Sequence, residues 1–198
     1  MNKIILTLAA VMTMSFAACA QNNKREKNMQ TEKKPLVVYF SATGTTARAA
    51  RMIADVTGGT LCEIVPQQTY TSDDLDWNDK QSRSSVEMNN PDARPAVKDT
   101  KIDFAAYDVI FIGYPIWWNQ APRIINTFIE SHDLKGKTLV PFATSGGSGI
   151  NNSAEELKKT YPDLEWQKGK LLNGANCDVI RAWVSDLAKN YDKAKISK

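Results

Sequence analysis

The chain has 198 residues and carries 25 basic and 22 acidic side chains. Six of the basic and two of the acidic residues precede Pro35, which leaves 19 basic and 20 acidic residues, a net charge of −1, in the remainder. This length suggests one domain with additional segments. A nearly neutral domain argues against nucleic acid binding, which usually needs a basic face.

The first 18 residues have the pattern of a secretory signal peptide. Lys3 provides a positive start, Ile4 to Phe16 form an apolar stretch, and two alanines precede Cys19. The apolar stretch is shorter than the roughly 20 residues that a membrane-spanning helix needs. We therefore expect residues 1–18 to direct export.

The run Phe16-Ala17-Ala18-Cys19 resembles a bacterial lipobox, in which the cysteine is acylated and becomes the new N-terminus, although Phe16 departs from the usual Leu. An ordinary cleaved signal, with Cys19 incidental, is the alternative. Residues 19–34 are polar and contain five basic side chains, so we expect a flexible tether before a domain at 35–198. Together these features predict a lipoprotein held at the cell envelope, on the periplasmic side or at the surface.

From Pro35 onward, apolar runs alternate with helical patterns. Continuous apolar runs are typical of strands buried on both faces, and apolar residues at helical spacing indicate amphipathic helices. The predicted strands are Leu36–Phe40, Thr60–Val65, Val109–Gly113, Thr138–Ala143 and a weaker one at Lys170–Leu172.

Helical patterns separate these strands. The first helix covers Ala49 to Val56 and stops at Gly58, the second starts near Pro122, and the last carries its apolar face from Val179 to Leu187. Between them a helix is predicted to open at Ser153, whose spacing to Glu156 fits a capping box. Strands alternating with helices predict a parallel sheet with helices on both faces.

A long connection, 66–106, separates the second and third strands. Ser72 to Met88 could hold a helix, and Pro91 to Pro95 has the composition of an extended return. Long connections in compact domains are often lids or binding loops, and simple packing over the sheet edge is the alternative.

Cys62 and Cys177 match neither a zinc pattern nor a C-x-x-C motif. An exported protein could join them in a disulfide; because Cys62 lies in a predicted strand and Cys177 near the start of the last helix, we expect two buried thiols. His132 follows an amphipathic helix, and with no second histidine we expect a role at the helix end and no metal site.

The loop Ser41-Ala42-Thr43-Gly44-Thr45-Thr46 follows the first strand and leads into a helix. A helix N-terminus offers free N–H groups and a positive dipole end, which suit a phosphate. The loop has hydroxyls but no basic residue, so neutral donors would hold that phosphate. It also lacks the dinucleotide and P-loop fingerprints. Capping of the helix by these hydroxyls is the alternative.

Two further loops follow the third and fourth strands. Tyr114-Pro115-Ile116-Trp117-Trp118-Asn119 places two adjacent tryptophans in a loop, where stacking on a planar ring would gain about 0.5–1.5 kcal/mol beyond area burial. Thr144-Ser145-Gly146-Gly147-Ser148-Gly149 has three glycines, which let the backbone approach a flat ligand.

These residues carry a resemblance to a known family. The run from Phe40 to Thr46 closely resembles the flavodoxin signature at the FMN phosphate, and the blocks 113–118 and 141–149 resemble the two loops that flank the flavin. The resemblance spans about 35–190. It implies an α/β, flavodoxin-like, doubly wound five-stranded parallel sheet of order 2-1-3-4-5, with helices on both faces and FMN at the switch point.

By position, the resemblance also implies three groups of FMN contacts and no catalytic side chain. The phosphate group would be bound by Ser41, Thr43, Gly44, Thr45 and Thr46. One side of the isoalloxazine would be lined by Pro115, Ile116, Trp117, Trp118 and Asn119. The pyrimidine end or the other side would be contacted by Thr144, Ser145, Gly146 and Gly147.

Two features depart from the small electron-carrier flavodoxins. Those carriers are strongly acidic, whereas this domain is nearly neutral, with a local acidic cluster at Asp73, Asp74, Asp76 and Asp79. This difference puts a very low redox potential in doubt. Export would also separate the protein from cytosolic reductases.

Three functions follow as hypotheses. The first is FMN-dependent electron transfer at the cell envelope, with a redox partner protein or a small quinone-like acceptor. The second is an FMN-dependent NAD(P)H:quinone-type oxidoreductase, whose substrate pocket would be walled by Tyr70, Trp77 or Trp118. The third is a binding module that kept the fold without the flavin.

Overall fold

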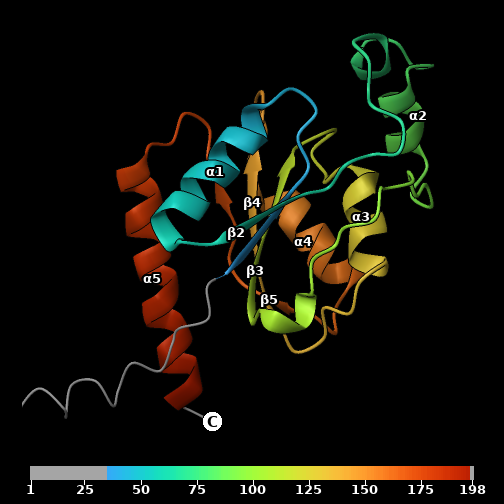
Figure 1. Cartoon of the computed structure of the whole chain (residues 1–198). Coiled ribbons are helices and arrows are strands. Elements are labelled where there is room, and N and C mark those ends of the chain that lie inside the picture. The colour runs from blue at the N-terminus through green and yellow to red at the C-terminus, as the bar shows by residue number, and fades with distance from the viewer. Residues whose placement is uncertain (1–34, 197–198) are drawn as a thin grey trace, which may run out of the picture. The chain divides into compact units, whose positions relative to one another are not determined.

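The computed structural model describes residues 35–196, with side chains described as far as Lys189. The predicted signal peptide, Cys19 and the tether lie outside the described residues. Within them, the strands form one parallel sheet of order β2-β1-β3-β4-β5, as predicted, with β6 also paired to β4 (Figure 1). The strands are β1 Leu36–Tyr39, β2 Thr60–Glu63, β3 Val109–Pro115, β4 Thr138–Thr144, β5 Glu165–Trp166 and β6 Lys170–Leu171.

Helices cover both faces of the sheet (Figure 1). One face carries α1 and α5, and the other carries α3 and α4, while α2 belongs to the connection 66–106 and lies beyond the sheet. The helices are α1 Thr45–Thr57, α2 Arg83–Asn89, α3 Arg123–Glu130, α4 Asn151–Thr160 and α5 Cys177–Ile196. None of the helices in 35–196 combines the length and the apolar content needed to cross a membrane.

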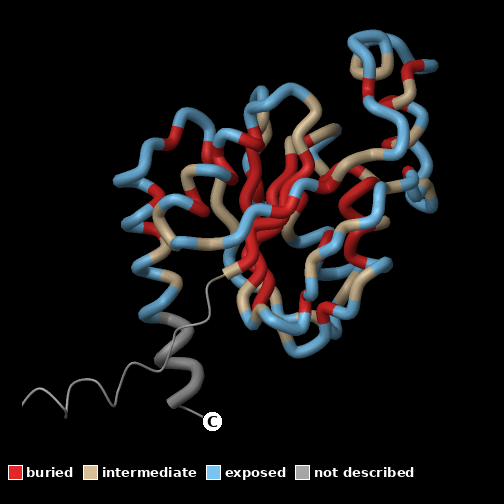
Figure 2. Tube along the Cα trace, viewed as in Figure 1, coloured by how far each residue is buried: buried red, intermediate tan, exposed pale blue. Residues whose placement is uncertain are grey.

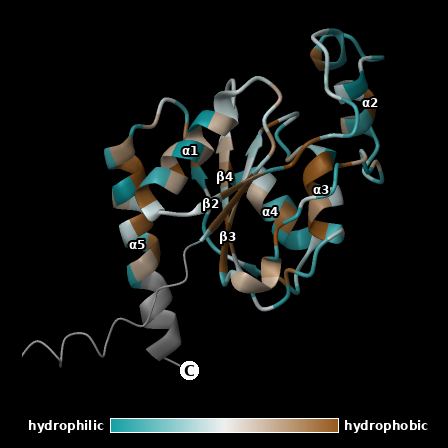
Figure 3. Cartoon of the chain, in the orientation of Figure 1, coloured by the Kyte–Doolittle hydropathy of each residue, from teal (hydrophilic) through white to brown (hydrophobic). Residues whose placement is uncertain are grey.

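The strands β1, β3 and β4 form the buried centre of the fold (Figure 2), and apolar residues predominate in them (Figure 3). Side chains alternate between the two faces of each strand. In β1, Leu36 and Val38 pack with the core on the α3 and α4 side, and Val37 and Tyr39 pack with the core on the α1 and α5 side. Burial on both faces is the reason that β1 is a continuous apolar run.

The fifth strand of the sheet is interrupted. β5 pairs with the start of β4 and β6 with its end, so the prediction at 170–172 identified only the second half. The break lies opposite Pro141, which has no N–H for a ladder hydrogen bond. A Cβ on Gly169 would stand 3.1 Å from the Pro141 carbonyl oxygen, so this backbone approach is close.

The predicted capping box at Ser153 is wrong. α4 begins at Asn151 after Ile150, and Ser153 is fully buried inside its first turn. The Ser153 hydroxyl donates to the Ile150 carbonyl at 2.9 Å and lies 3.2 Å from the Tyr114 hydroxyl. Serine can satisfy its hydroxyl on a preceding carbonyl within a helix, so its presence alone does not mark a helix start.

Candidate functional site

The three predicted loops meet at the carboxyl edge of the sheet and are bonded to one another. The Thr46 and Thr144 hydroxyls form a buried hydrogen bond of 2.8 Å between the first and third loops. The Ile116 N–H donates to the Thr144 carbonyl at 2.8 Å, which ties the second loop to the third. The Asn119 carbonyl accepts from the Asn152 side chain at 2.9 Å, which fixes the second loop to α4.

The first loop presents an open turn at the N-terminus of α1. Gly44 has φ of +85° and occupies the cap position without a side-chain capping bond, so the capping alternative is not realised. The helical ladder begins with the Arg48 N–H donating to the Gly44 carbonyl, which leaves the preceding N–H groups without a helical partner. Thr43 and Thr45 are exposed beside them.

Ser41 is the informative residue of this loop. Its hydroxyl oxygen is buried and has no hydrogen-bond partner among the described residues. Buried polar atoms are nearly always bonded, so an orphan of this kind indicates a missing partner. A phosphate oxygen at the end of α1 would supply that partner.

The second loop is a tight two-residue turn. Trp117 and Gln120 exchange backbone hydrogen bonds of 3.0 and 2.9 Å, and Trp118 and Asn119 have φ of +45° and +62°. These angles are typical of a type I′ turn. A tryptophan at positive φ is rare, and such strain concentrates at functional sites.

The two tryptophans differ in environment, which the sequence alone left undecided. Trp117 is half-buried and packs edge-on against Phe40 and Tyr70, with ring centroids 5.7 and 5.4 Å apart. Trp118, at the tip of the turn, is 44% exposed. Trp117 therefore supports the loop, and Trp118 is free to contact a ligand.

The third loop is held by Asn173, which the sequence did not indicate as part of the site. The Ser145 N–H donates to Asn173 Oδ1 at 2.8 Å, and Asn173 Nδ2 donates to the Ser145 carbonyl at 2.6 Å. The Ser145 hydroxyl in turn accepts from the Gly147 and Ser148 N–H groups. Gly146 and Gly147 remain exposed, and a Cβ on either would meet nothing within 4 Å.

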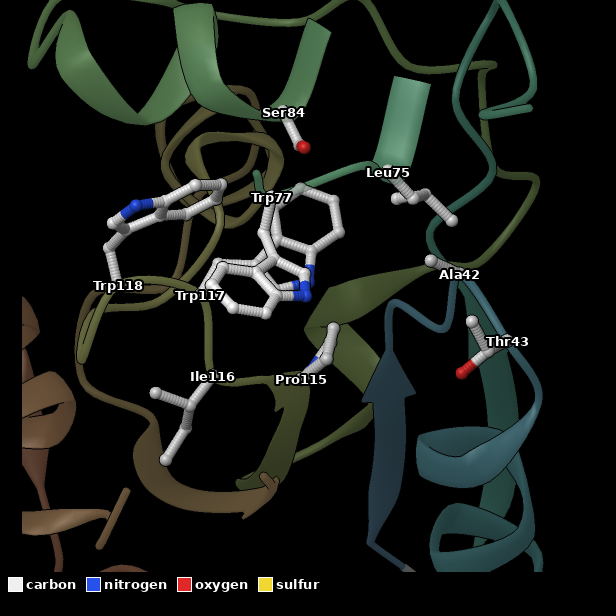
Figure 4. A pocket seen from close by; sticks show the side chains of 9 residues that line it. All are labelled: Ala42, Thr43, Leu75, Trp77, Ser84, Pro115, Ile116, Trp117 and Trp118. Carbon is white, nitrogen blue, oxygen red and sulfur yellow. The ribbon is translucent and has the colours of Figure 1, made fainter. Parts of the chain in front are cut away.

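A cavity of about 400 Å³ opens between the first two loops and the connection 66–106 (Figure 4). This volume is in the range of small-molecule sites. Its lining comes from Ala42, Thr43, Pro115, Ile116, Trp117 and Trp118, with Leu75, Trp77 and Ser84 from the connection. The glycines of the third loop do not line this cavity. The predicted site residues therefore gather at one edge of the sheet, but not all of them border the same cavity.

Comparison with known proteins decides the family. Residues 34–187 match the family model described as flavodoxin. The chain belongs to the flavodoxin family. No curated protein matches it.

Solved structures of flavoproteins resemble this flavodoxin-family chain over most of its length. A flavoprotein from Bacteroides eggerthii is 66% identical, with a TM-score of 0.76, over 78% of this chain and 98% of that chain. One from Bacteroides uniformis is 57% identical, with a TM-score of 0.75, over 77% of this chain and 97% of that chain. A flavoprotein from Lactobacillus acidophilus, in complex with FMN, is 23% identical, with a TM-score of 0.59, over 70% of this chain and 93% of that chain.

The connection 66–106 of this flavodoxin is held together by a partly buried cluster of its own residues. The Arg83 guanidinium stacks 3.9 Å from the centre of the Tyr70 ring and bonds Glu87 at 2.6 Å and the Gln68 carbonyl at 2.7 Å. The Tyr70 hydroxyl donates to Glu87 at 2.5 Å. Burial, followed by this bond to a carboxylate, raises the pKa of Tyr70 well above its usual range.

The structure also shows the environments of Cys62, Cys177 and His132. Cys62 is buried as expected, and burial raises the pKa of its thiol. The prediction for Cys177 is wrong, because this residue starts α5 on the exposed side. Both thiols are free. His132 lies just after α3, as expected; its Nδ1 bonds the Phe128 carbonyl at 2.8 Å.

Proposed function

We propose that this flavodoxin-family protein binds one FMN at the carboxyl edge of its sheet and transfers electrons at the cell envelope. The observation that carries the FMN assignment is the orphaned Ser41 hydroxyl beside the open Gly44 turn and next to an aromatic cavity. FMN joins a phosphate to a flat ring, which matches this combination. The FMN complex of the Lactobacillus acidophilus flavoprotein supports the same cofactor.

The residues present fit the two ends of FMN. Ser41, Thr43 and the N–H groups at 44–46 would bind the phosphate, and the Thr46 side chain would connect the loops through Thr144 instead. The ring would lie along 115–118, with its pyrimidine end near 145–147. The flavin supplies the redox chemistry, while the protein binds and orients it.

Transfer to a redox partner is favoured over turnover of a substrate. Among the lining residues of the cavity, none is a histidine, cysteine, lysine or carboxylate that could move a proton to a substrate. The test is the rate at which the FMN-loaded protein oxidises NADH or NADPH with a quinone. A carrier gives turnover far below the ~10 s⁻¹ typical of enzymes. Turnover at that level would establish the oxidoreductase alternative.

Anchoring through Cys19 is the second part of the proposal. Its support is the sequence alone: a signal-like segment, a lipobox-like run and a polar tether. Acyl chains add about 0.8 kcal/mol for each buried CH₂, so several chains on one cysteine hold a protein firmly at a membrane. We expect the protein in the membrane fraction and its Cys19→Ala variant in the soluble fraction. Equal distribution of the two would contradict the anchor.

A further inference from the structure

We propose that Trp77, on the connection 66–106, forms the outer wall of the flavin site and limits the access of small electron acceptors to the ring. This inference rests on the proposed FMN binding and adds a residue that controls how the bound flavin reacts.

The third loop contributes no aromatic side chain to the site. The second loop carries Trp117 and Trp118, whereas the third loop, 144–149, contains only hydroxyl residues and glycine. The cavity nevertheless has aromatic lining beyond the second loop, because Trp77 reaches it from the connection together with Leu75 (Figure 4). A planar ring placed in this cavity would therefore contact side chains from two separate segments.

Trp77 is unusual in its exposure. It is 73% exposed, the highest value among the large apolar side chains of the described residues, and it makes no ring contact with another aromatic residue there. Exposed apolar side chains that stand alone are normal, but Trp77 lines one cavity together with Leu75, Trp117 and Trp118, and contiguous apolar surface of this kind marks binding sites. Covering this indole with a flavin ring would remove apolar surface from water.

Local hydrogen bonds hold Trp77 in that exposed place. The Asp76 carboxylate accepts from the Asn78 N–H at 2.9 Å, and the Asp79 carboxylate accepts from the Gln81 N–H at 2.8 Å. These carboxylates fix the turns on the C-terminal side of the tryptophan. The acidic cluster thus shapes the segment that presents Trp77.

The wall is also fixed relative to the second loop. Tyr70 packs against both Phe40, at the end of β1, and Trp117, with ring centroids 5.6 and 5.4 Å apart. At its base, the connection closes through a bridge between Pro66 and Val97. These contacts hold the base of the segment that carries Trp77 beside the second loop.

A flavin bound beside Trp77 would be less accessible to small electron acceptors. The cavity of about 400 Å³ has the size of a site for one ligand. Once the flavin ring fills it, a quinone can stack on the ring only where Trp77 has moved away. Removing the indole of Trp77 should expose the face of the flavin ring that it covers.

The experiment compares the full chain with Trp77→Ala, Trp77→Phe and Val86→Ala. Val86 is a matched control, because it is half exposed on α2 and does not line the cavity. FMN affinity is measured by fluorescence titration. With protein in excess over FMN, the bound flavin is then reduced by dithionite and mixed without oxygen with a benzoquinone. Transfer of two electrons and two protons yields the quinol and the oxidised flavin.

We expect Trp77→Ala to weaken FMN binding by about 2- to 10-fold, the loss of one stacking contact, and to speed reoxidation by the quinone. Trp77→Phe should restore most of both properties, and Val86→Ala should change neither. Unchanged FMN affinity and unchanged reoxidation rate in Trp77→Ala would overturn the role of Trp77 as a wall of the site. Weaker FMN binding without faster reoxidation would overturn the role of Trp77 in limiting access to the ring. In both cases FMN binding by the wild-type chain would stand. Failure of the wild-type chain to bind FMN would overturn the proposed function and this inference together.

Discussion

The proposed phosphate site depends most on Ser41. Its buried hydroxyl lacks a partner in the described protein, whereas the buried Ser153 hydroxyl is bonded to Ile150. An unsatisfied buried polar group costs about 1–3 kcal/mol, and a hydrogen bond to a charged group contributes about 1.5–3 kcal/mol. The two serines should therefore respond in opposite ways to the same substitution.

Ser41→Ala should leave the FMN-free protein as stable as the wild type, or more stable, because it removes an orphaned hydroxyl. It should weaken FMN binding by about 10- to 100-fold, through one lost bond to the phosphate, without affecting riboflavin. Ser153→Ala should destabilise the protein by about 1 kcal/mol and leave FMN affinity unchanged. Urea unfolding and flavin titration measure both effects, and a loss of stability in Ser41→Ala would count against the assignment.

Gly44 tests the backbone of the same loop. Its φ of +85° is unfavourable for any residue with a Cβ, while the space around that Cβ is open. Gly44→Val should therefore destabilise the protein by about 1–2 kcal/mol through backbone strain, and it should weaken FMN binding by blocking the phosphate. Gly146→Ala, in open space and without a positive φ, is the control and should be nearly neutral in stability. FMN binding by Gly44→Val at wild-type strength would show that the phosphate lies elsewhere.

At the scale of elements, the connection 66–106 is the distinctive part of this fold. Tyr70 packs against Phe40 at the end of β1 and under the guanidinium of Arg83, whose ion pair with Glu87 is largely buried, with side-chain exposures of 19% and 13%. Removing one partner of an ion pair at this depth costs more than removing one partner of an exposed pair, because the other charge is left buried and unpaired.

Arg83→Ala should loosen α2 and its neighbouring loop, seen as faster amide hydrogen exchange at 70–90, and should weaken FMN binding. Lysine keeps the charge but cannot make the same forked contacts, so Arg83→Lys should recover only part of the protection. Arg181→Ala removes an exposed ion pair with Asp178 on α5 and should alter neither property. Equal exchange in Arg83→Ala and wild type would show that the cluster does not hold the connection.

Local chemistry predicted the strands and the three loops, whereas the sheet order was implied by the resemblance to flavodoxins. Apolar runs such as 36–40 indicate buried strands, and hydroxyl- or glycine-rich turns follow them directly. The position of Trp77, the pairing of Asn173 with Ser145 and the inward hydroxyl of Ser153 depend on contacts between distant segments, and no local pattern encodes them. The exposure of Cys177 was missed because an amphipathic helix also has an outer face.

At the scale of the whole molecule, cofactor binding and folding should be coupled. The proposed cofactor site joins the loops that follow β1, β3 and β4 with the connection 66–106, so a ligand there would contact segments from most of the domain. A ligand that binds only the folded state stabilises it by about 2.7 kcal/mol at 100 times its dissociation constant. FMN should therefore raise the unfolding temperature, and riboflavin at the same concentration should raise it much less. Equal shifts from the two flavins would show that the phosphate contributes nothing.

We propose that the loop 41–46 holds the phosphate of an FMN whose ring lies against 115–118. The most direct test is a titration of the purified protein with FMN and with riboflavin, following the quenching of flavin fluorescence. We expect strong quenching by FMN that saturates at one equivalent, with riboflavin binding far more weakly. No quenching by either flavin would contradict it.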